Sequence, residues 1–369
     1  MLSAVPAVVP SAAVPPATLG ATDITFAELA IAFLAHAEKH YRHPDGRPTG
    51  EIANYHMAIR HAREMCGSLL AAEFGPKLLK AVREKMVAAK WCRRQVNQGV
   101  DRLKRMFKWA ASEELIPAGV FHALQTVAGL QAGRTAAPDR PGVLPVSDAA
   151  VDATLPYLNR HVRGLIEFQR LTGCRPGEAC AIRVADIDKA GDVWVFRPAH
   201  HKNSYRGTKR SIAIGPKAQT LIERFATDNP EDFLFSPSRC VAEGIAERAA
   251  ARKTPRYPSH MKRNAAKRVA APKRAPDEQY TSMVIAHAVR RAVQLANRDG
   301  CRNPEYGPTL PLVPPWHPNQ IRHLYATTVR REYGLEAAQV SLGHSKADTT
   351  QIYAEKNEAL AASVAAKIG

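Results

Sequence analysis

The sequence predicts a mainly helical (α+β) protein with a small antiparallel β-sheet, divided into two domains. Apolar residues recur at helical spacing through most of its 369 residues, a length that fits about two domains. Two segments, DVWVFRPAH and RSIAIG, alternate instead between apolar and polar residues and predict a strand–turn–strand pair. The stretch 129–146 is rich in Gly and Pro and lacks periodicity, so we interpret it as the linker between the domains.

The first 22 residues (1–22) predict a disordered leader, because prolines interrupt every apolar run in them. They contain no Lys or Arg, which argues against a signal peptide. No apolar run in the sequence approaches the length needed to cross a membrane. The six cysteines are scattered without CxxC or CxxH spacing, which argues against a zinc site and fits a reducing compartment. These features predict a cytoplasmic protein with no metal or cofactor.

Residues 23–128 predict a helical bundle. Thr25 and Glu28 form a capping box in front of an apolar run with helical spacing. Three further helices are predicted by NYHMAIRHAREMCGSLLA, GPKLLKAVREKMVAA and WCRRQVNQGVDRLKRMFKWAASEELI. The last of these is rich in cations, and few acidic residues balance them before Glu113.

The charge of the chain indicates a polyanionic partner. It has 52 Lys and Arg against 34 Asp and Glu, a net charge of +18 and a pI near 9.8. Such a balance is typical of proteins that bind nucleic acid, although a merely soluble basic protein is an alternative. On the cation-rich helix the alternatives are contact with a DNA backbone and a solvated face. The candidate DNA contacts are Arg93, Arg94, Lys104, Arg105 and Lys108.

Residues 147–369 predict the second domain. Ser147 is a helix cap, VRGLIEFQRLTG predicts a buried helix, and Pro216 follows the strand pair at the first turn of another helix. An insertion at about 252–279 is strongly basic, since residues 252–274 include nine Lys or Arg and no Asp or Glu. Three prolines and the lack of an apolar stripe favour a mobile basic loop, which either tracks phosphates or is solvated.

Four short segments contain the residues suited to chemistry. They are LTGCRPGEACAIRVADI with Arg175 and Glu178, HHKNSYRGTKRSIAIG with Lys202, PNQIRHLYATTVRREYG with Arg322, and LGHSKADTTQIYAEKN with His344 and Tyr353. A tyrosine is a poor nucleophile at neutral pH, because its pKa is near ~10. Guanidiniums can hold two phosphate oxygens each and stabilise charge that develops there, and a cationic Lys can protonate a leaving oxygen. Each residue alone fits an ordinary packing, turn or surface position, but together they predict a phosphate-centred site.

These segments resemble the tyrosine recombinases, the phage-type integrases, and the resemblance extends from about Thr25 to the end of the chain. It is strongest in TGCRPGEA, IRHLYAT and LGHSKADTTQIYA, including the interval from His344 to Tyr353. It implies an N-terminal helical core-binding domain and a catalytic domain that together close around double-stranded DNA. The implied activity is site-specific DNA recombination or integration by a strand transferase of a mobile element.

The resemblance also implies the role of each site residue. Tyr353 is the nucleophile that forms a 3′-phosphotyrosine. Lys202 is the acid that protonates the leaving 5′-oxygen, and Lys209 in the same turn is the alternative. The remaining roles are phosphate binding by Arg175, Arg322 and His344, and support of Arg175 by Glu178.

The sequence departs from the family pattern at Asn319, where the motif H-x-x-R-H has its first histidine. Asn can donate and accept hydrogen bonds but cannot act as a base. A catalytically impaired DNA-binding relative is therefore one alternative, and a topoisomerase-like or telomere-resolving enzyme with the same chemistry is another. The resemblance implies a homotetramer on DNA and leaves open a monomer in solution and an accessory directionality factor. It also implies a bacterial or phage-encoded protein associated with the nucleoid.

Overall fold

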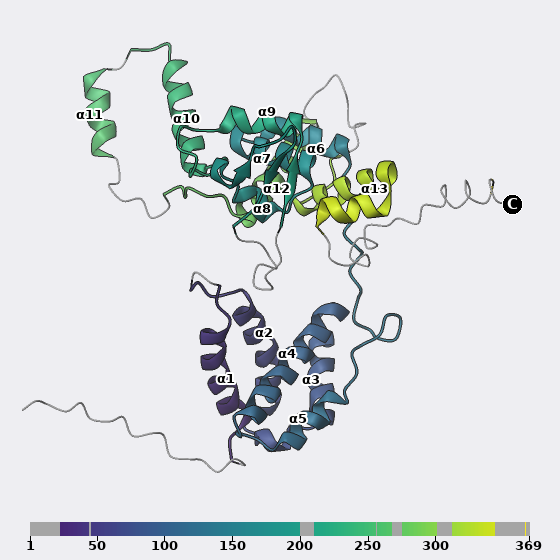
Figure 1. Ribbon diagram of the computed structural model, residues 1–369. Helices are drawn as coiled ribbons and strands as arrows, with labels where there is room; N and C mark the ends of the chain where they lie inside the picture. Colours follow the sequence, from purple (N-terminus) through teal and green to yellow (C-terminus); the bar gives the residue numbers. More distant parts are fainter. Residues whose placement is uncertain are drawn as a thin grey trace, which may run out of the picture. The chain divides into compact units, whose positions relative to one another are not determined.

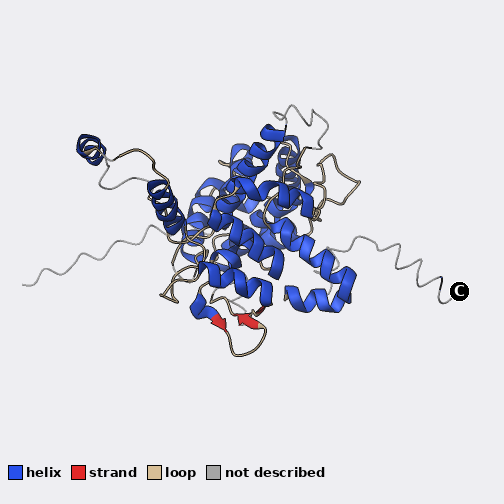
Figure 2. Ribbon diagram, turned by 90° about the horizontal axis from the view of Figure 1, so that it is seen from above, coloured by secondary structure: helices blue, strands red, loops and turns tan. Residues whose placement is uncertain are grey.

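The protein divides into two compact units, Met1–Gly142 and Val143–Gly369, and each is described by itself (Figure 1). The computed structural model describes residues 23–43, 46–199, 210–255, 257–267, 275–300, 312–343 and 366. Helices dominate both units, and the strands form one small sheet in the described part of the chain (Figure 2). The division between the units falls inside the Gly- and Pro-rich stretch 129–146. The predicted α+β class with a small antiparallel sheet is confirmed.

The N-terminal unit is a bundle of helices around α4. Its elements are α1 (Phe26–His40), α2 (Glu51–Cys66), the 3-10 turn η1 (Ala71–Glu73), α3 (Pro76–Ala88), α4 (Arg93–Ser112) and α5 (Ala118–Gln125). The capping box at the start of α1 is present, since the Thr25 backbone N–H donates to Glu28 at 2.9 Å and Thr25 Oγ1 accepts from the Glu28 N–H at 3.3 Å. Helix α4 packs against all four other α-helices of the unit.

The apolar face of α4 explains why this helix is central. Val96, Val100, Leu103 and Phe107 recur at helical spacing and are all buried. Phe107 stacks on Phe74 with ring centroids 4.9 Å apart, and both lie in the core of the bundle. The cationic residues of α4 therefore lie on the sides that the core does not use.

The C-terminal unit consists of helices and one small sheet, which packs against α7 and α13 through β3. Its helices are α6 (Asp148–Thr154), α7 (Arg160–Thr172), α8 (Pro176–Cys180), α9 (Pro216–Phe225), α10 (Pro237–Ala250), α11 (Pro258–Ala266), α12 (Ser282–Gly300) and α13 (Asn319–Leu342), with 3-10 turns η2 (Leu155–Tyr157) and η3 (Val184–Asp186). Helix α7 is the packing centre, because it contacts α8, α9, α10 and α13 as well as the sheet.

The sheet contains the predicted strand pair. Strands β2 (Trp194–Phe196) and β3 (Ile212–Ile214) run antiparallel, with Trp194 opposite Ile214 and Phe196 opposite Ile212. A third strand, β1 (Ile187–Asp188), pairs with the other edge of β2. Sequence patterning missed β1, because two residues are too few to show alternation. The sheet fixes both ends of the segment that joins β2 to β3.

The basic insertion is partly helical. We expected an irregular loop at 252–274, but Pro258–Ala266 form α11, and Pro258 occupies its first turn. No residue of α11 is buried, in agreement with the lack of an apolar stripe. Proline in the first turn does not interrupt a helix, which is why the proline count misled the prediction.

Two glycines end helices where the candidate site lies. Gly173 ends α7 with φ 64°, and Gly343 ends α13 with φ 61°, both in the left-handed region that favours glycine. Gly334, with φ 87°, divides α13 into two helical parts. A Cβ at residue 173 would overlap the ring of Tyr325, so the turn after α7 requires a glycine for space as well as for conformation.

We expect Gly173→Ala to lower the free energy of unfolding by at least about 2 kcal/mol, because it combines left-handed strain with overpacking against Tyr325. Chemical denaturation measures the loss. Gly244→Ala is the matched control, since a Cβ at this position in α10 meets open space. Equal stabilities of the two variants would contradict the role of the Gly173 turn.

Candidate active site

Arg175 and Glu178 form a compact pair at the start of α8. The backbone N–H of Arg175 donates to Glu178 Oε2 at 2.8 Å, and Arg175 Nη1 donates to Oε1 at 2.8 Å. The Glu178 side chain is only 4% exposed, whereas that of Arg175 is 29% exposed. Burial by itself raises the pKa of Glu178, but the Arg175 N–H and the guanidiniums of Arg210 and Arg175 outweigh it and hold that pKa below its ordinary value. Glu178 is therefore a buried carboxylate that orients an accessible guanidinium.

Arg322 joins the two glycine turns. It lies on α13 and is only 2% exposed. Its Nη1 donates to the carbonyl of Gly173 at 2.8 Å, and its Nη2 donates to the carbonyl of Leu342 at 2.7 Å. Carbonyls at a helix C-terminus lack partners within the helix, so these two bonds satisfy groups that would otherwise be buried unpaired. Arg322 thereby holds the turn before Arg175 beside the turn before His344.

Asn319 interacts with a neighbouring histidine. Asn319 Nδ2 lies 3.3 Å from His323 Nε2, one helical turn away on α13. Burial, with smaller contributions from His317 and Arg322, lowers the pKa of His323 to about 4. The ring is therefore neutral at pH 7, and its Nε2 can accept a hydrogen bond from the amide of Asn319. This contact supports a structural role for Asn319.

Four residues named by the sequence lie outside the described residues: Lys202, Lys209, His344 and Tyr353. The structure fixes the chain next to them. Arg210 directly follows the segment with both lysines, and Gly343 directly precedes His344. Of the residues proposed from sequence, the structure thus brings Arg175 and Glu178 into direct contact. It connects Arg322 to them through the carbonyl of Gly173.

Sequence reasoning missed Arg210. Its side chain is 5% exposed, and its Nε lies 3.7 Å from Glu178 Oε1. In the sequence it is one of several cations in HHKNSYRGTKR, so composition gave no reason to select it. Its position before the buried Ile212 was the only available signal.

Three of the five candidate DNA contacts on α4, namely Arg93, Lys104 and Arg105, have partners in the N-terminal unit. Arg93 binds Asp139 at 2.8 Å, and Lys104 donates to the Val127 carbonyl at 2.6 Å. Arg105 lies 3.6 Å from Glu51 and its guanidinium is 5.6 Å from the Tyr55 ring centroid. Arg94 and Lys108 are exposed. Because residues 94, 105 and 108 fall within one side of the helix at 3.6 residues per turn, this side is the more accessible cationic surface of α4.

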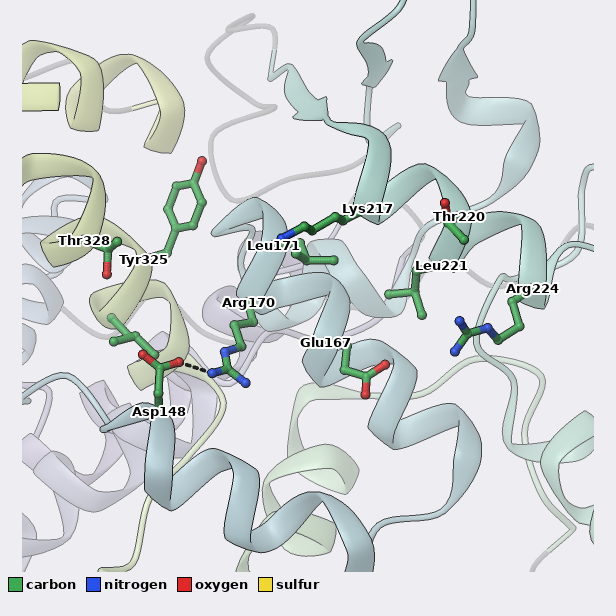
Figure 3. Close-up of a pocket in the computed structure, with 11 residues that line it drawn as sticks. Asp148, Glu167, Arg170, Leu171, Lys217, Thr220, Leu221, Arg224, Tyr325 and Thr328 are labelled. Atoms are coloured by element: carbon green, nitrogen blue, oxygen red, sulfur yellow. Dashed lines mark ion pairs between the residues drawn. The ribbon is translucent and has the colours of Figure 1, made fainter. Parts of the chain in front are cut away.

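A cavity of about 510 Å³ lies between α7, α9 and α13 (Figure 3). Arg170 and Lys217 line it, and Arg170 is paired with Asp148 and Asp152. Among the proposed active-site residues that the structure describes, none lines this cavity. In the part of the chain that the structure describes, no group of three or more His, Cys, Asp and Glu side chains could hold a metal ion. Within the same residues, no helix is both long and apolar enough to cross a membrane.

The fold matches solved structures of DNA recombinases. A Tn1549 transposon integrase in complex with transposon right end DNA is 15% identical, with a TM-score of 0.58, and the match covers 94% of this chain and 99% of that one. A lambda integrase dimer bound to a COC′ core site is 14% identical, with a TM-score of 0.58, covering 91% and 78% of the two chains. No curated protein matches the sequence.

The helices and the small antiparallel sheet of this chain thus share the fold of these integrases. The model of the phage integrase family matches residues 149–359. The chain belongs to this family, and the resemblance seen in the sequence is confirmed.

We expect the free energy of unfolding to fall as the pH is lowered from about 6.5 to about 4. The folded pKa of His323 lies below its ordinary value of 6.5, so in this window the unfolded chain binds a proton that the folded chain does not. The stability is complete above about pH 6.5 and is lost progressively toward pH ~4. Denaturation of the full chain across this range measures the slope.

The matched variant for this prediction is His323→Gln, which keeps a hydrogen-bonding side chain and does not titrate there. It should show a shallower loss of stability with acid than the unchanged protein. His61 and His161, whose burial also lowers their pKa, contribute to both proteins equally. Identical slopes for the two proteins would contradict the assignment of a neutral, buried His323.

Proposed function

We propose that this site-specific recombinase cuts and rejoins double-stranded DNA through a 3′-phosphotyrosine on Tyr353. The observation that most directly supports this proposal is the Arg175–Glu178 pair near Arg322 in a chain of the phage integrase family. A guanidinium has five N–H donors, and the contact with Glu178 uses Nη1 of Arg175. The Arg175 side chain is exposed enough to contact a DNA phosphate. A guanidinium can bind two oxygens of the same phosphate.

The proposed reaction is a transesterification. Tyr353 releases its phenol proton to water, its oxygen attacks the phosphorus to form the new ester bond, and the bond to the 5′-oxygen breaks. Lys202, or Lys209 in the same segment, donates the proton that the leaving 5′-oxygen needs. Because the phosphotyrosine conserves the energy of the broken bond, a free 5′-hydroxyl can reverse the step and rejoin the strand without ATP.

The cations stabilise the charge that gathers on the phosphate oxygens. Arg175 and His344 are proposed as direct ligands, and Glu178 keeps Arg175 in place. Arg322 has its two terminal nitrogens on backbone carbonyls. Its contact with the phosphate therefore uses its remaining N–H groups or displaces one of those carbonyls. Positive charge near the phenol also favours ionisation of Tyr353.

The assembly follows from the reaction. Recombination joins two duplexes by four strand cleavages, so we propose a homotetramer on DNA, with the two units of each chain closing around the duplex. The free protein is proposed to be a monomer, and an accessory directionality factor is compatible with this scheme. We propose a cytoplasmic, nucleoid-associated enzyme of a bacterial or phage mobile element.

We expect the protein to form a covalent adduct with a nicked suicide substrate that carries its recognition site, and Tyr353→Phe to abolish the adduct. Denaturing gel electrophoresis separates the adduct from free DNA. In Arg175→Ala the adduct should fall by about 100-fold or more, as when a transition-state donor is removed, while duplex affinity changes little.

Other outcomes of this experiment identify the alternatives. Tight, specific binding without an adduct would establish a DNA-binding relative without catalysis. An adduct that yields relaxed DNA but no joint products from two duplexes would establish a topoisomerase-like enzyme. Loss of binding in proportion to loss of cleavage in Arg175→Ala would contradict its role as a transition-state ligand.

The basic insertion is proposed to contact DNA phosphates. Lys262, Arg263 and Lys267 lie on or next to α11, where all described residues are exposed. No acidic residue occurs between Glu247 and Asp277, so the chain around α11 offers these cations no local partner. Phosphates of a duplex are the polyanion that the rest of the site requires.

Replacement of Lys262, Arg263 and Lys267 by Gln should lower the slope of log binding constant against log salt by about 2–3, since each phosphate contact contributes about 0.9. Fluorescence anisotropy at several salt concentrations measures the slope. The control replaces three exposed arginines that pair with acids in the chain, Arg197, Arg298 and Arg331, and removes the same charge. Equal slopes in both triple variants would indicate that the cations of α11 are solvated and do not bind phosphates.

A further inference from the structure

Arg210 is a buried cation whose role is not explained by the reaction described above. It lies two residues before β3, directly after the segment that carries Lys202 and Lys209. The residue is only 7% exposed. Arginine stays charged in proteins, and a buried charge is retained only where its surroundings compensate for it. The contacts of Arg210 therefore indicate its function.

The first contact is with Glu178. Arg210 Nε lies 3.7 Å from Glu178 Oε1, the same oxygen that accepts the 2.8 Å hydrogen bond from Arg175 Nη1. One buried carboxylate thus faces two guanidiniums. Any shift of Arg210 changes the field at this oxygen and the position that Glu178 imposes on Arg175.

The second contact is with the turn at the end of α13. A Cβ at residue 343 would overlap Arg210 Nη1 and lie 3.1 Å from Arg210 Cζ, so the guanidinium packs directly on Gly343. Strand β3 and α13 also pack against each other. Arg210 therefore lies against the residue that immediately precedes His344.

Arg210 and Arg322 both contact the end of α13, and each links it to a different part of the site. Arg322 joins the Gly173 and Leu342 carbonyls by hydrogen bonds. Arg210 contacts Glu178 on one side and Gly343 on the other. Unlike Arg322, Arg210 has two buried nitrogens, Nε and Nη2, without a hydrogen-bond partner in the described part of the chain. A group held by packing and charge, rather than by a full set of hydrogen bonds, can respond to an added anion.

We propose that Arg210 is a positioning residue for strand cleavage: it sets Arg175 through Glu178 and sets the end of α13 through Gly343. The local charge supports this role, because two guanidiniums, those of Arg175 and Arg210, face one carboxylate. The excess positive charge suits a phosphate. This inference rests on the proposed function.

The test uses the full chain and the nicked suicide substrate at saturating concentration. Arg210→Gln should lower the single-turnover cleavage rate by about 100-fold, the scale expected when reacting groups are misplaced by about 1 Å. Its dissociation constant for the duplex should change by less than about threefold, because Arg210 is buried and most phosphate contacts are made by exposed cations. Arg197→Gln, at an exposed arginine just after β2, is the matched control and should cleave normally.

A double-mutant cycle with Glu178→Gln separates positioning from a general structural effect. If Arg210 acts through Glu178, adding Arg210→Gln to Glu178→Gln should lower the cleavage rate by much less than it does in the unchanged protein. Arg210→Lys keeps the charge and should restore part of the rate. It also provides the test if Arg210→Gln does not fold, since its rate should lie below that of the unchanged protein at equal duplex affinity.

Several results would overturn the inference. They are an unchanged rate in Arg210→Gln, a loss of duplex affinity as large as the loss of rate, and effects of Arg210→Gln and Glu178→Gln that multiply. These results are distinct from failure of the proposed function. In that case the unchanged protein itself forms no covalent adduct with the suicide substrate.

Discussion

The contact on which the site depends is the pair of hydrogen bonds from Arg322 to the carbonyls of Gly173 and Leu342. These residues are 149 and 20 positions from Arg322 in the sequence. The two bonds satisfy backbone carbonyls at the ends of α7 and α13. They hold the turn that precedes Arg175 beside the turn that precedes His344. A charged donor can satisfy two buried carbonyls more strongly than a neutral one, so the arginine is suited to this position even without DNA.

The groups around this contact contribute both to the stability of the fold and to the proposed activity. Gly173 and Gly343 are in left-handed conformations at the ends of the two joined helices, and each is packed so closely that a side chain would overlap a neighbour. Glu178 is buried beneath Arg175, where its charge is held by guanidiniums and a backbone N–H. A strand transferase needs a fixed arrangement of charges before the phosphate arrives, because reorganisation during the reaction raises the barrier. We propose that the closely packed glycine turns and the shared carboxylate supply that arrangement.

Much of this fold could be predicted from local patterns. The capping box of Thr25 and Glu28, the cap at Ser147 and the strand pair around Trp194 and Ile212 are short-range features, and the structure confirms them. The helix α11 was not predicted, because its prolines suggested a loop although Pro258 occupies a permitted first-turn position. On α4, spacing identified the cationic sides but not that Arg93 and Lys104 have partners in the same unit, at Asp139 and Val127.

The sequence by itself determined the family and predicted the residue types of the candidate site, since the order and spacing of the four segments around Arg175, Lys202, Arg322 and Tyr353 are properties of the chain alone. Only the tertiary structure decided which groups those side chains meet. It placed Arg322 on backbone carbonyls, paired Asn319 with His323, and buried Arg210 beside Glu178. The reason is physical. Helical and strand periods report which face of an element is apolar, whereas the partner of a buried cation depends on which distant parts of the chain the fold brings next to it.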